Sequence, residues 1–195
     1  MSRSRTHGLF GALALVGLLG LQDPARADQL FLKVTDQIQG QITGWYNPFD
    51  ELGGVSLASH GLIEHLSWSV VSPRDAASGL PTGKRQHKPL VLGLRMSDAT
   101  ILLANSLFHN SNLPQLEVLV FARDPDTGVP AQRFKWLLTN ANVASYATYT
   151  VREDDELVTY VDLQFTYQKI GLEDSVNGIS VEDDWETPIA APQLP

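Results

Sequence analysis

The stretch GKRQHKPLVLGLRMSDATILLANSLFHNSNLPQLEVLVFAR, residues 83–123, decides the fold. Its pattern predicts a strand over Leu90–Arg95, then a helix, then a second and strongly apolar strand over Gln115–Arg123. Ser97 is a residue type that caps helix N-termini, so we expect the helix to begin there. It is the only convincing helix after residue 27. A single helix among many strands can pack only against a sheet or barrel, which it should cover as a lid.

The expected helix has one apolar face, made of residues at helical spacing: Ala99, Leu103, Ala104, Leu107 and Phe108. Asp98 suits the first turn, next to the positive end of the helix dipole. Asn110 and Pro114 favour a helix end before the next strand. Because Gln115–Arg123 is apolar on both faces, it should be covered twice, by the core and by either the helix or another subunit.

The N-terminus has the sequence pattern of an export leader. Arg3 and Arg5 precede an apolar run of 13 residues, Leu9–Leu21, and an A-x-A pattern follows at Ala25 and Ala27. Thirteen residues are too few to span a bilayer, which needs about 20. We therefore favour a cleaved signal peptide over residues 1–27; an N-terminal membrane anchor is the alternative.

Composition restricts the partners. Residues 1–27 hold three of the 14 basic and one of the 22 acidic residues, which leaves a formal charge of −10 for residues 28–195. Such a chain repels nucleic acid and anionic membranes. The sequence has no cysteine, so the exported protein cannot be held by disulfides. No second apolar span follows the leader, so we expect no stable membrane insertion after cleavage.

The rest of the chain is rich in strand patterns. We expect short strands over residues 30–34, 39–45, 62–70, 132–139, 143–151 and 158–170. Residues 62, 64, 66, 68 and 70 are expected on the core face of their strand, as are Val161, Leu163, Phe165 and Tyr167 of theirs. Residues 152–156 and the pair Asn177-Gly178, which favours a type I′ hairpin, are predicted turns. Residues 71–88 form a long polar loop of the kind that is often functional.

The predicted fold class is therefore mainly β: a small β-barrel of two packed, mostly antiparallel sheets with one lateral helix. It should form one domain over residues 28–187, followed by a disordered tail over residues 188–195.

Metal-binding patterns are weak. Four histidines, His60, His65, His87 and His109, would form a zinc site only if the fold gathered them. Residues 124–128 resemble the start of a calcium loop, but Pro125 and Lys135, at the twelfth position, favour a plain hairpin turn. We predict no metal and no cofactor.

Catalytic patterns are weak as well. Gly83-Lys84 lacks the upstream glycine of a phosphate loop, and no serine lies in a G-x-S-x-G elbow. The carboxylates of residues 153–156 and 182–184 read as solvated runs. We predict that the protein is not an enzyme.

Five segments follow one another along the chain: IEHLSWS (63–69), HKPL (87–90), LTNANVASY (138–146), FTYQKI (165–170) and DDWE (183–186). Taken together, they resemble the Hcp family, which forms the tube of bacterial type VI secretion systems. The matching positions are Ile63, Glu64, Ser67, Trp68, His87, Lys88, Pro89, Asn140, Ala141, Val143, Tyr146, Tyr167, Lys169, Ile170, Asp184 and Trp185. The resemblance covers about residues 30–185.

This resemblance implies a small β-barrel with a lateral helix that assembles into hexameric rings, which stack into a hollow tube able to carry effectors. The implied partners are further copies of the chain and the spike, sheath or effector proteins of type VI secretion. The segment like residues 71–88 is, in the family, an extended loop that reaches toward neighbouring rings.

Two alternatives stay open beside the tube protein. Ordinary members of the family have no leader, so a chain with one suggests an exported barrel that acts alone as a periplasmic or extracellular binding or carrier module. The other alternative is an enzyme or effector on the same scaffold. Ring formation separates the tube protein from the module that acts alone, and metal content tests for the enzyme.

Overall fold

The computed structural model describes residues 28–186. The predicted leader, with Ala25 and Ala27, and the predicted tail at residues 188–195 lie outside this range. The described part contains twelve strands and one helix: β1 (Gln29–Asp36), β2 (Gly40–Gln41), β3 (Glu51–Leu52), β4 (Val55–Ser56), β5 (Gly61–Ser67), β6 (Val70–Val71), β7 (Gln86–His87), β8 (Leu90–Arg95), α1 (Asp98–Phe108), β9 (Leu113–Arg123), β10 (Pro130–Glu153), β11 (Glu156–Asp174) and β12 (Ile179–Asp184).

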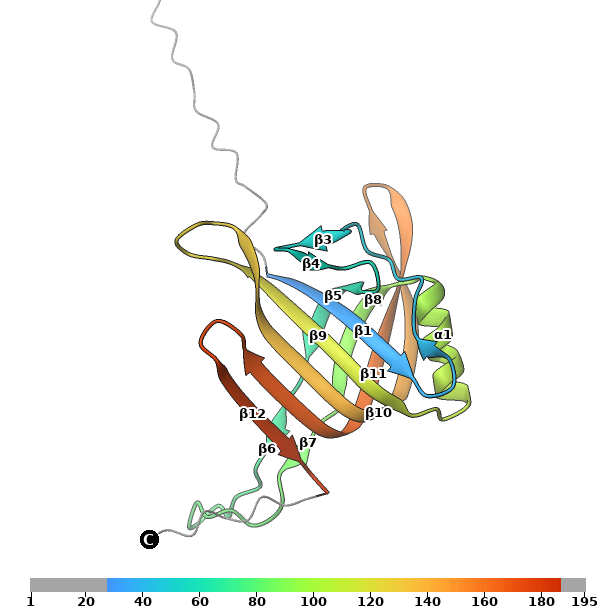
Figure 1. Ribbon diagram of the computed structural model, residues 1–195. Coiled ribbons are helices and arrows are strands. Elements are labelled where there is room, and N and C mark those ends of the chain that lie inside the picture. The colour runs from blue at the N-terminus through green and yellow to red at the C-terminus, as the bar shows by residue number, and fades with distance from the viewer. Residues whose placement is uncertain (1–27, 187–195) are drawn as a thin grey trace, which may run out of the picture.

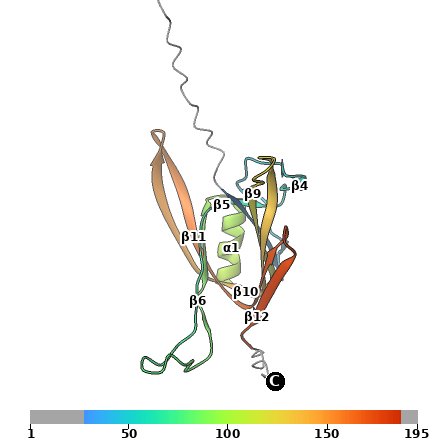
Figure 2. The ribbon, with the colours of Figure 1, turned by 90° about the vertical axis from the view of Figure 1, so that its left-hand side faces the viewer.

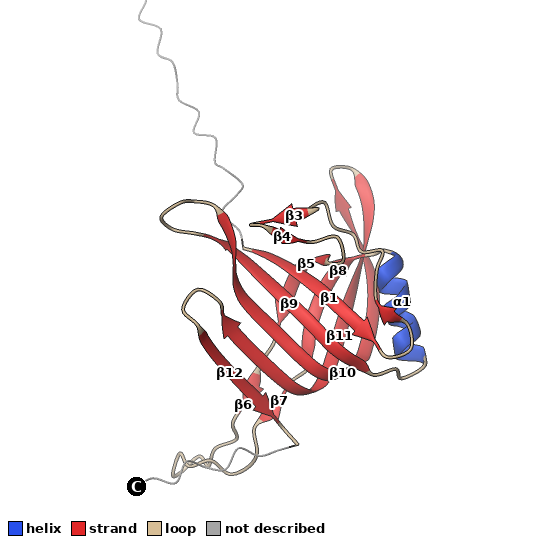
Figure 3. Ribbon diagram, in the orientation of Figure 1, coloured by secondary structure: helices blue, strands red, loops and turns tan. Residues whose placement is uncertain are grey.

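The main sheet closes on itself (Figures 1 and 3). Its neighbours run β10-β9-β1-β5-β8-β11, and β10 pairs with β11 as well as with β9. All these pairings are antiparallel, while β12 extends the sheet from β11 and β2 pairs with β1. The mainly β prediction with a single helix is confirmed.

Helix α1 lies at one side of the barrel, between its two walls (Figures 1 and 2). Ser97 is the N-cap, and its backbone N–H donates to Thr100 Oγ1 at 3.0 Å. Ala99 and Leu103 are fully buried in the core, as predicted. The assignment of Phe108 to the apolar face is wrong, because this side chain is 79% exposed. It lies about 140° around the axis from Leu103, beyond the buried stripe.

The main core fills the inside of the barrel. It gathers buried side chains from β1, β5, β8, β9, β10, β11 and α1, including Val161, Leu163, Phe165 and Tyr167, the alternating residues predicted for β11. Val118 and Trp136, which pair across β9 and β10, face the same interior. The core face of β11 was therefore predicted correctly.

A second core lies on the outer face of β1 and β9. Phe31, Leu119 and Phe121 are buried there under residues 45–60, a segment that carries β3 and β4 and that we call the flap. The flap supplies buried Leu57 and several half-buried side chains. The strand apolar on both faces is thus covered by the chain's own flap, and the expected cover by the helix or another subunit is wrong.

A bulge in β5 changes which residues face the core. Ile63 pairs with Leu94 and His65 with Gly93, so the register shifts between them. Ile63 lies in the main core and Leu62 packs on the second core, whereas Leu66 and Trp68 beyond the bulge return to the main core. The prediction that residues 62, 64, 66, 68 and 70 share one core face holds only for Leu66 and Trp68. One extra residue inverts the alternation before them, and residue 70 lies in β6, outside both cores.

Three other boundaries differ from prediction. Residues 132–139 and 143–151 belong to one strand, β10, which continues through Asn140 at a φ of 50°. Residues 39–45 form only the short β2 before the chain leaves the sheet. The β11–β12 hairpin exists, but Asp174 pairs with Ile179, so its loop has four residues rather than two.

Residues 70–87 form an extended arm (Figure 2). Val70 and Val71 of β6 pair with His87 and Gln86 of β7, and an isolated bridge joins Arg74 to Pro81 nearer the tip. The predicted long loop is therefore a two-stranded projection.

Candidate interaction site at the base of the arm

The arm leaves the barrel beside the last strand, and side chains bridge the two. Strand β7 pairs with β6, and β12 pairs with β11. Side chains link this region to β12: Arg85 Nη2 lies 2.7 Å from Asp183 Oδ1, and His87 Nε2 lies 2.9 Å from Asp183 Oδ2. We call this side-chain junction the seam.

A chain of hydrogen bonds runs from the seam into the core. The indole N–H of Trp68 donates to the Tyr167 hydroxyl, which lies 3.1 Å from His87 Nδ1. If the hydroxyl donates to Nδ1, the His87 proton sits on Nε2 and is donated to Asp183. Burial raises the pKa of Tyr167, which keeps the hydroxyl protonated and able to donate.

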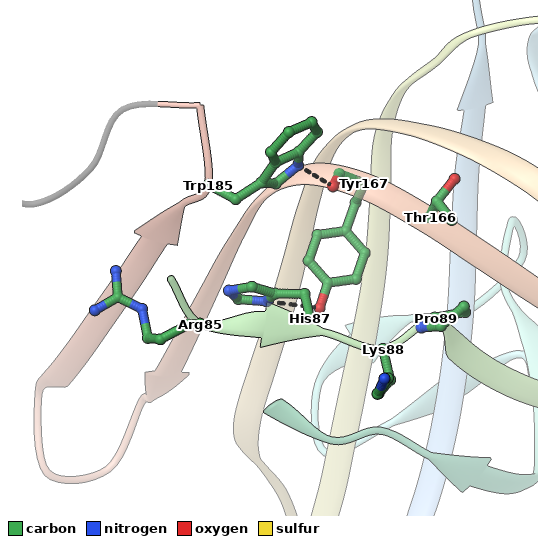
Figure 4. Close-up of a pocket in the computed structure, with 7 residues that line it drawn as sticks. All are labelled: Arg85, His87, Lys88, Pro89, Thr166, Tyr167 and Trp185. Atoms are coloured by element: carbon green, nitrogen blue, oxygen red, sulfur yellow. Dashed lines mark hydrogen bonds between the residues drawn. The ribbon is translucent and has the colours of Figure 1, made fainter. Parts of the chain in front are cut away.

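Trp185 closes one side of this cluster (Figure 4). Its indole N–H donates to the backbone oxygen of Tyr167 at 2.7 Å, and its backbone N–H donates to that of Gln168 at 3.3 Å. The ring is held in place although the residue is 52% exposed. It borders a cavity of about 260 Å³, lined by Arg85, His87, Lys88, Pro89, Thr166, Tyr167 and Trp185.

The fold brings together several positions picked out by the family resemblance. Those that meet at the arm base are Trp68, His87, Lys88, Pro89, Tyr167 and Trp185. They come from β7 and β11 and from residues just beyond β5, β7 and β12. Segments separated by up to about a hundred residues thus form one local structure.

Other resemblance positions lie in the barrel itself. Ile63, Ala141, Val143 and Ile170 are buried in the main core, and Tyr146 is half-buried against it. Asn140 donates its side-chain N–H to Gln168 Oε1 at 2.8 Å, from the bend in β10.

The remaining resemblance positions are on the surface. Lys169 pairs with Glu182 at 2.7 Å, and Asp184 accepts a hydrogen bond from the Glu186 backbone at 3.0 Å. Ser67 is exposed at the end of β5, and Glu64 lies at the bulge. Partial burial first and the charge of Glu153 second raise the pKa of Glu64.

Sequence reasoning missed the two residues that join the arm to β12. Arg85 lies in the predicted long loop, and Asp183 lies in an acidic run and in the DDWE segment, but neither was expected to pair with the other. The local pattern did not mark Asp183, because it lies in an acidic run and is half-buried like its neighbour Asp184.

The four histidines are not gathered into one site. His60 lies 3.9 Å from Glu117, His65 lies 3.5 Å from Asp162, His87 joins the seam, and His109 contacts its own helix end. Within residues 28–186 no group of three or more candidate ligands could hold a metal ion. Over the same residues, no helix has the length and apolar content to cross a membrane.

Removing the Tyr167 hydroxyl should weaken the arm base. Tyr167→Phe leaves the Trp68 indole N–H without its partner and frees one His87 nitrogen, which should lower the free energy of unfolding by about 1–3 kcal/mol. Urea unfolding measures this. Tyr146→Phe is the matched control, because within residues 28–186 that hydroxyl has no hydrogen-bond partner; equal losses in both variants would contradict the role of the Tyr167 hydroxyl.

Comparisons with known proteins agree with this fold. Residues 54–173 match the family described as type VI secretion system effector, Hcp. The "Major exported protein" of Pseudomonas aeruginosa is 29% identical over 171 residues, which cover 84% of this chain and 99% of that protein. A crystal structure of an Hcp protein is 26% identical, with a TM-score of 0.72 over 82% of this chain and 100% of its own.

A second solved structure, the secreted protein Hcp3 from Pseudomonas aeruginosa, shares the fold at 22% identity. Its TM-score is 0.65 over 80% of this chain and 99% of its own. This chain therefore has the fold of the solved Hcp structures. This chain belongs to the Hcp family, and the resemblance seen in the sequence is confirmed.

Proposed function

We propose that the protein is a structural, non-enzymatic subunit of type VI secretion that forms hexameric rings, and that these rings stack into a tube. Family membership over residues 54–173 supports this proposal. The observation that carries it is the arm, a paired projection that leaves the barrel and is fixed at its base by the contacts of Arg85 and His87 with Asp183. An anchored projection suits contact with a neighbouring ring.

Effector carriage and further partners follow from the same proposal. The lumen of a tube would hold effectors, and spike and sheath proteins would contact its end and outside. On the export route, the leader at residues 1–27 would be cut after Ala27 and send the chain to the periplasm or beyond. The name of the P. aeruginosa relative, an exported protein, supports export.

The second candidate is an exported barrel that acts alone as a periplasmic or extracellular binding or carrier module. The cavity beside Trp185 favours it, since an aromatic wall open to solvent is a common feature of binding sites.

The mass and shape of residues 28–195 test the two proposals against each other. Light scattering and electron microscopy should reveal a closed six-fold ring if the tube proposal holds. A monomer across a wide concentration range would rule it out and leave the binding module.

Shortening the arm should separate ring formation from stacking. A variant in which residues 74–81 are replaced by two glycines keeps β6 and β7 but removes the outer bridge between Arg74 and Pro81. Electron microscopy should show rings without tubes. Tubes as long as those of the natural chain would contradict the role of the arm, and Leu157→Ser, at an exposed site in another hairpin, is the control.

A further inference from the structure

The cavity at the arm base continues as a groove. A second cavity of about 360 Å³ shares Arg85, His87 and Trp185 with the first and extends along the arm to Ser72 and Pro81. The groove thus runs from β11 to the arm, and Trp185 borders both of its cavities.

The polar groups of the aromatic wall are already paired within the chain. The indole and backbone N–H groups of Trp185 bond to β11, the Tyr167 hydroxyl bonds to Trp68 and His87, and His87 Nε2 bonds to Asp183. What the wall offers a ligand is therefore aromatic surface of fixed orientation. Aromatic grooves of this kind recognise proline-rich segments, whose extended helix is preformed and loses little entropy on binding.

A segment of that composition comes directly after Trp185 and Glu186 in the sequence. Residues 187–195 read TPIAAPQLP, with three prolines, two bulky aliphatic residues and no charge. Thr187 precedes Pro188, which biases it toward an extended backbone. Nine residues in the polyproline conformation extend about 28 Å, enough to cross a groove that starts beside Trp185.

We propose that residues 187–195 fold back and dock in this groove on the same chain, with Pro188 and Ile189 against the Trp185 ring. The docked segment would touch β12 and the arm at once, and so hold the arm in one orientation. This intramolecular clasp needs no second copy of the chain, so it stands whether or not rings form.

Hydrogen exchange of the purified chain, followed by mass spectrometry, tests the clasp. In the variant Pro188→Gly/Ile189→Ser/Pro192→Gly, peptides over residues 83–88 and 182–186 should exchange faster than in the natural chain. The circuit of barrel strands is complete within residues 28–186, so folding is not at stake. Val176→Ser, an exposed apolar site in the β11–β12 turn outside the groove, is the matched control and should leave both peptides unchanged.

The reciprocal variant examines the other side of the contact. Trp185→Ala should speed exchange of the amides in residues 187–195. Equal exchange in the natural and triple-substituted chains would overturn the proposal. A difference that disappears on dilution would overturn it too, because it would assign the groove to the segment of a second copy.

Discussion

Phe165→Ala should lower the free energy of unfolding by about 3–5 kcal/mol, the cost of emptying a packed aromatic site in a core. Phe165 is fully buried in the main core, and its backbone pairs with Leu90 of β8 on one side and Val143 of β10 on the other. A cavity left at Phe165 would be flanked by β8 and β10. These strands cannot move toward each other to fill it without breaking their hydrogen bonds to β11.

Chemical denaturation measures the Phe165 effect. Thr166→Ala is the control, because this neighbour points out of the barrel and is exposed. A loss below about 1 kcal/mol for Phe165→Ala, the range typical of surface sites, would mean that the core refills the space and that β11 is less constrained than its pairings indicate.

The second large effect concerns Asp36, a carboxylate that is only 1% exposed at the end of β1. It accepts hydrogen bonds from the backbone N–H groups of residues 38 and 39, at 2.7 and 2.9 Å. The hydroxyls of Ser106 and Ser111 donate to it at 2.6 and 3.0 Å. Asp36→Ala removes all four hydrogen bonds and should cost about 2–4 kcal/mol. Asp50→Ala, at an exposed position, is the control for urea unfolding.

The Asp36 contribution should depend on pH. Burial by itself would raise the pKa of this carboxyl, but the hydrogen bonds from Ser106, Gln39, Ile38 and Ser111 outweigh it and hold the pKa below the ordinary 3.8. Folding therefore favours the ionised form. Its stabilisation is complete above pH 3.8 and is lost as the pH falls through the folded pKa. The stability gap between natural chain and Asp36→Asn should narrow in that acid range; a gap constant with pH would contradict the role of the charge.

Local patterns predicted the elements whose causes are local. The helix start at Ser97 and its end before Asn110, which has a φ of 48°, depend on residues within a few positions, and both were found where expected. The buried face of β11 was also predictable, since its alternation is unbroken from Val161 to Tyr167. These features require no knowledge of distant strands.

Features that depend on contacts between distant parts of the chain could not be predicted from local sequence patterns. The bulge between Ile63 and His65 depends on how β5 meets β8, so alternation alone put Leu62 on the wrong face. The flap covers Leu119 and Phe121 only because the chain doubles back over β1 and β9. In the same way, Asp36 meets Ser106 and Ser111 from α1 and the turn after it.

The candidate site was predicted in part. The resemblance pointed to Trp68, His87, Tyr167 and Trp185, which the fold gathers at one place. It did not indicate the ion pair of Arg85 with Asp183, because that contact exists only where β12 passes the arm.

The closed circuit of strands has a mechanical consequence. Each of β1, β5, β8, β9, β10 and β11 has a hydrogen-bonded neighbour on both sides. A pull on the chain therefore finds no free edge among these six from which to peel bonds one at a time, and must shear several rows together. The barrel should bear load as a rigid body, while strain is released first at the arm, where the contacts of Arg85 and His87 with Asp183 yield before any strand of the circuit does.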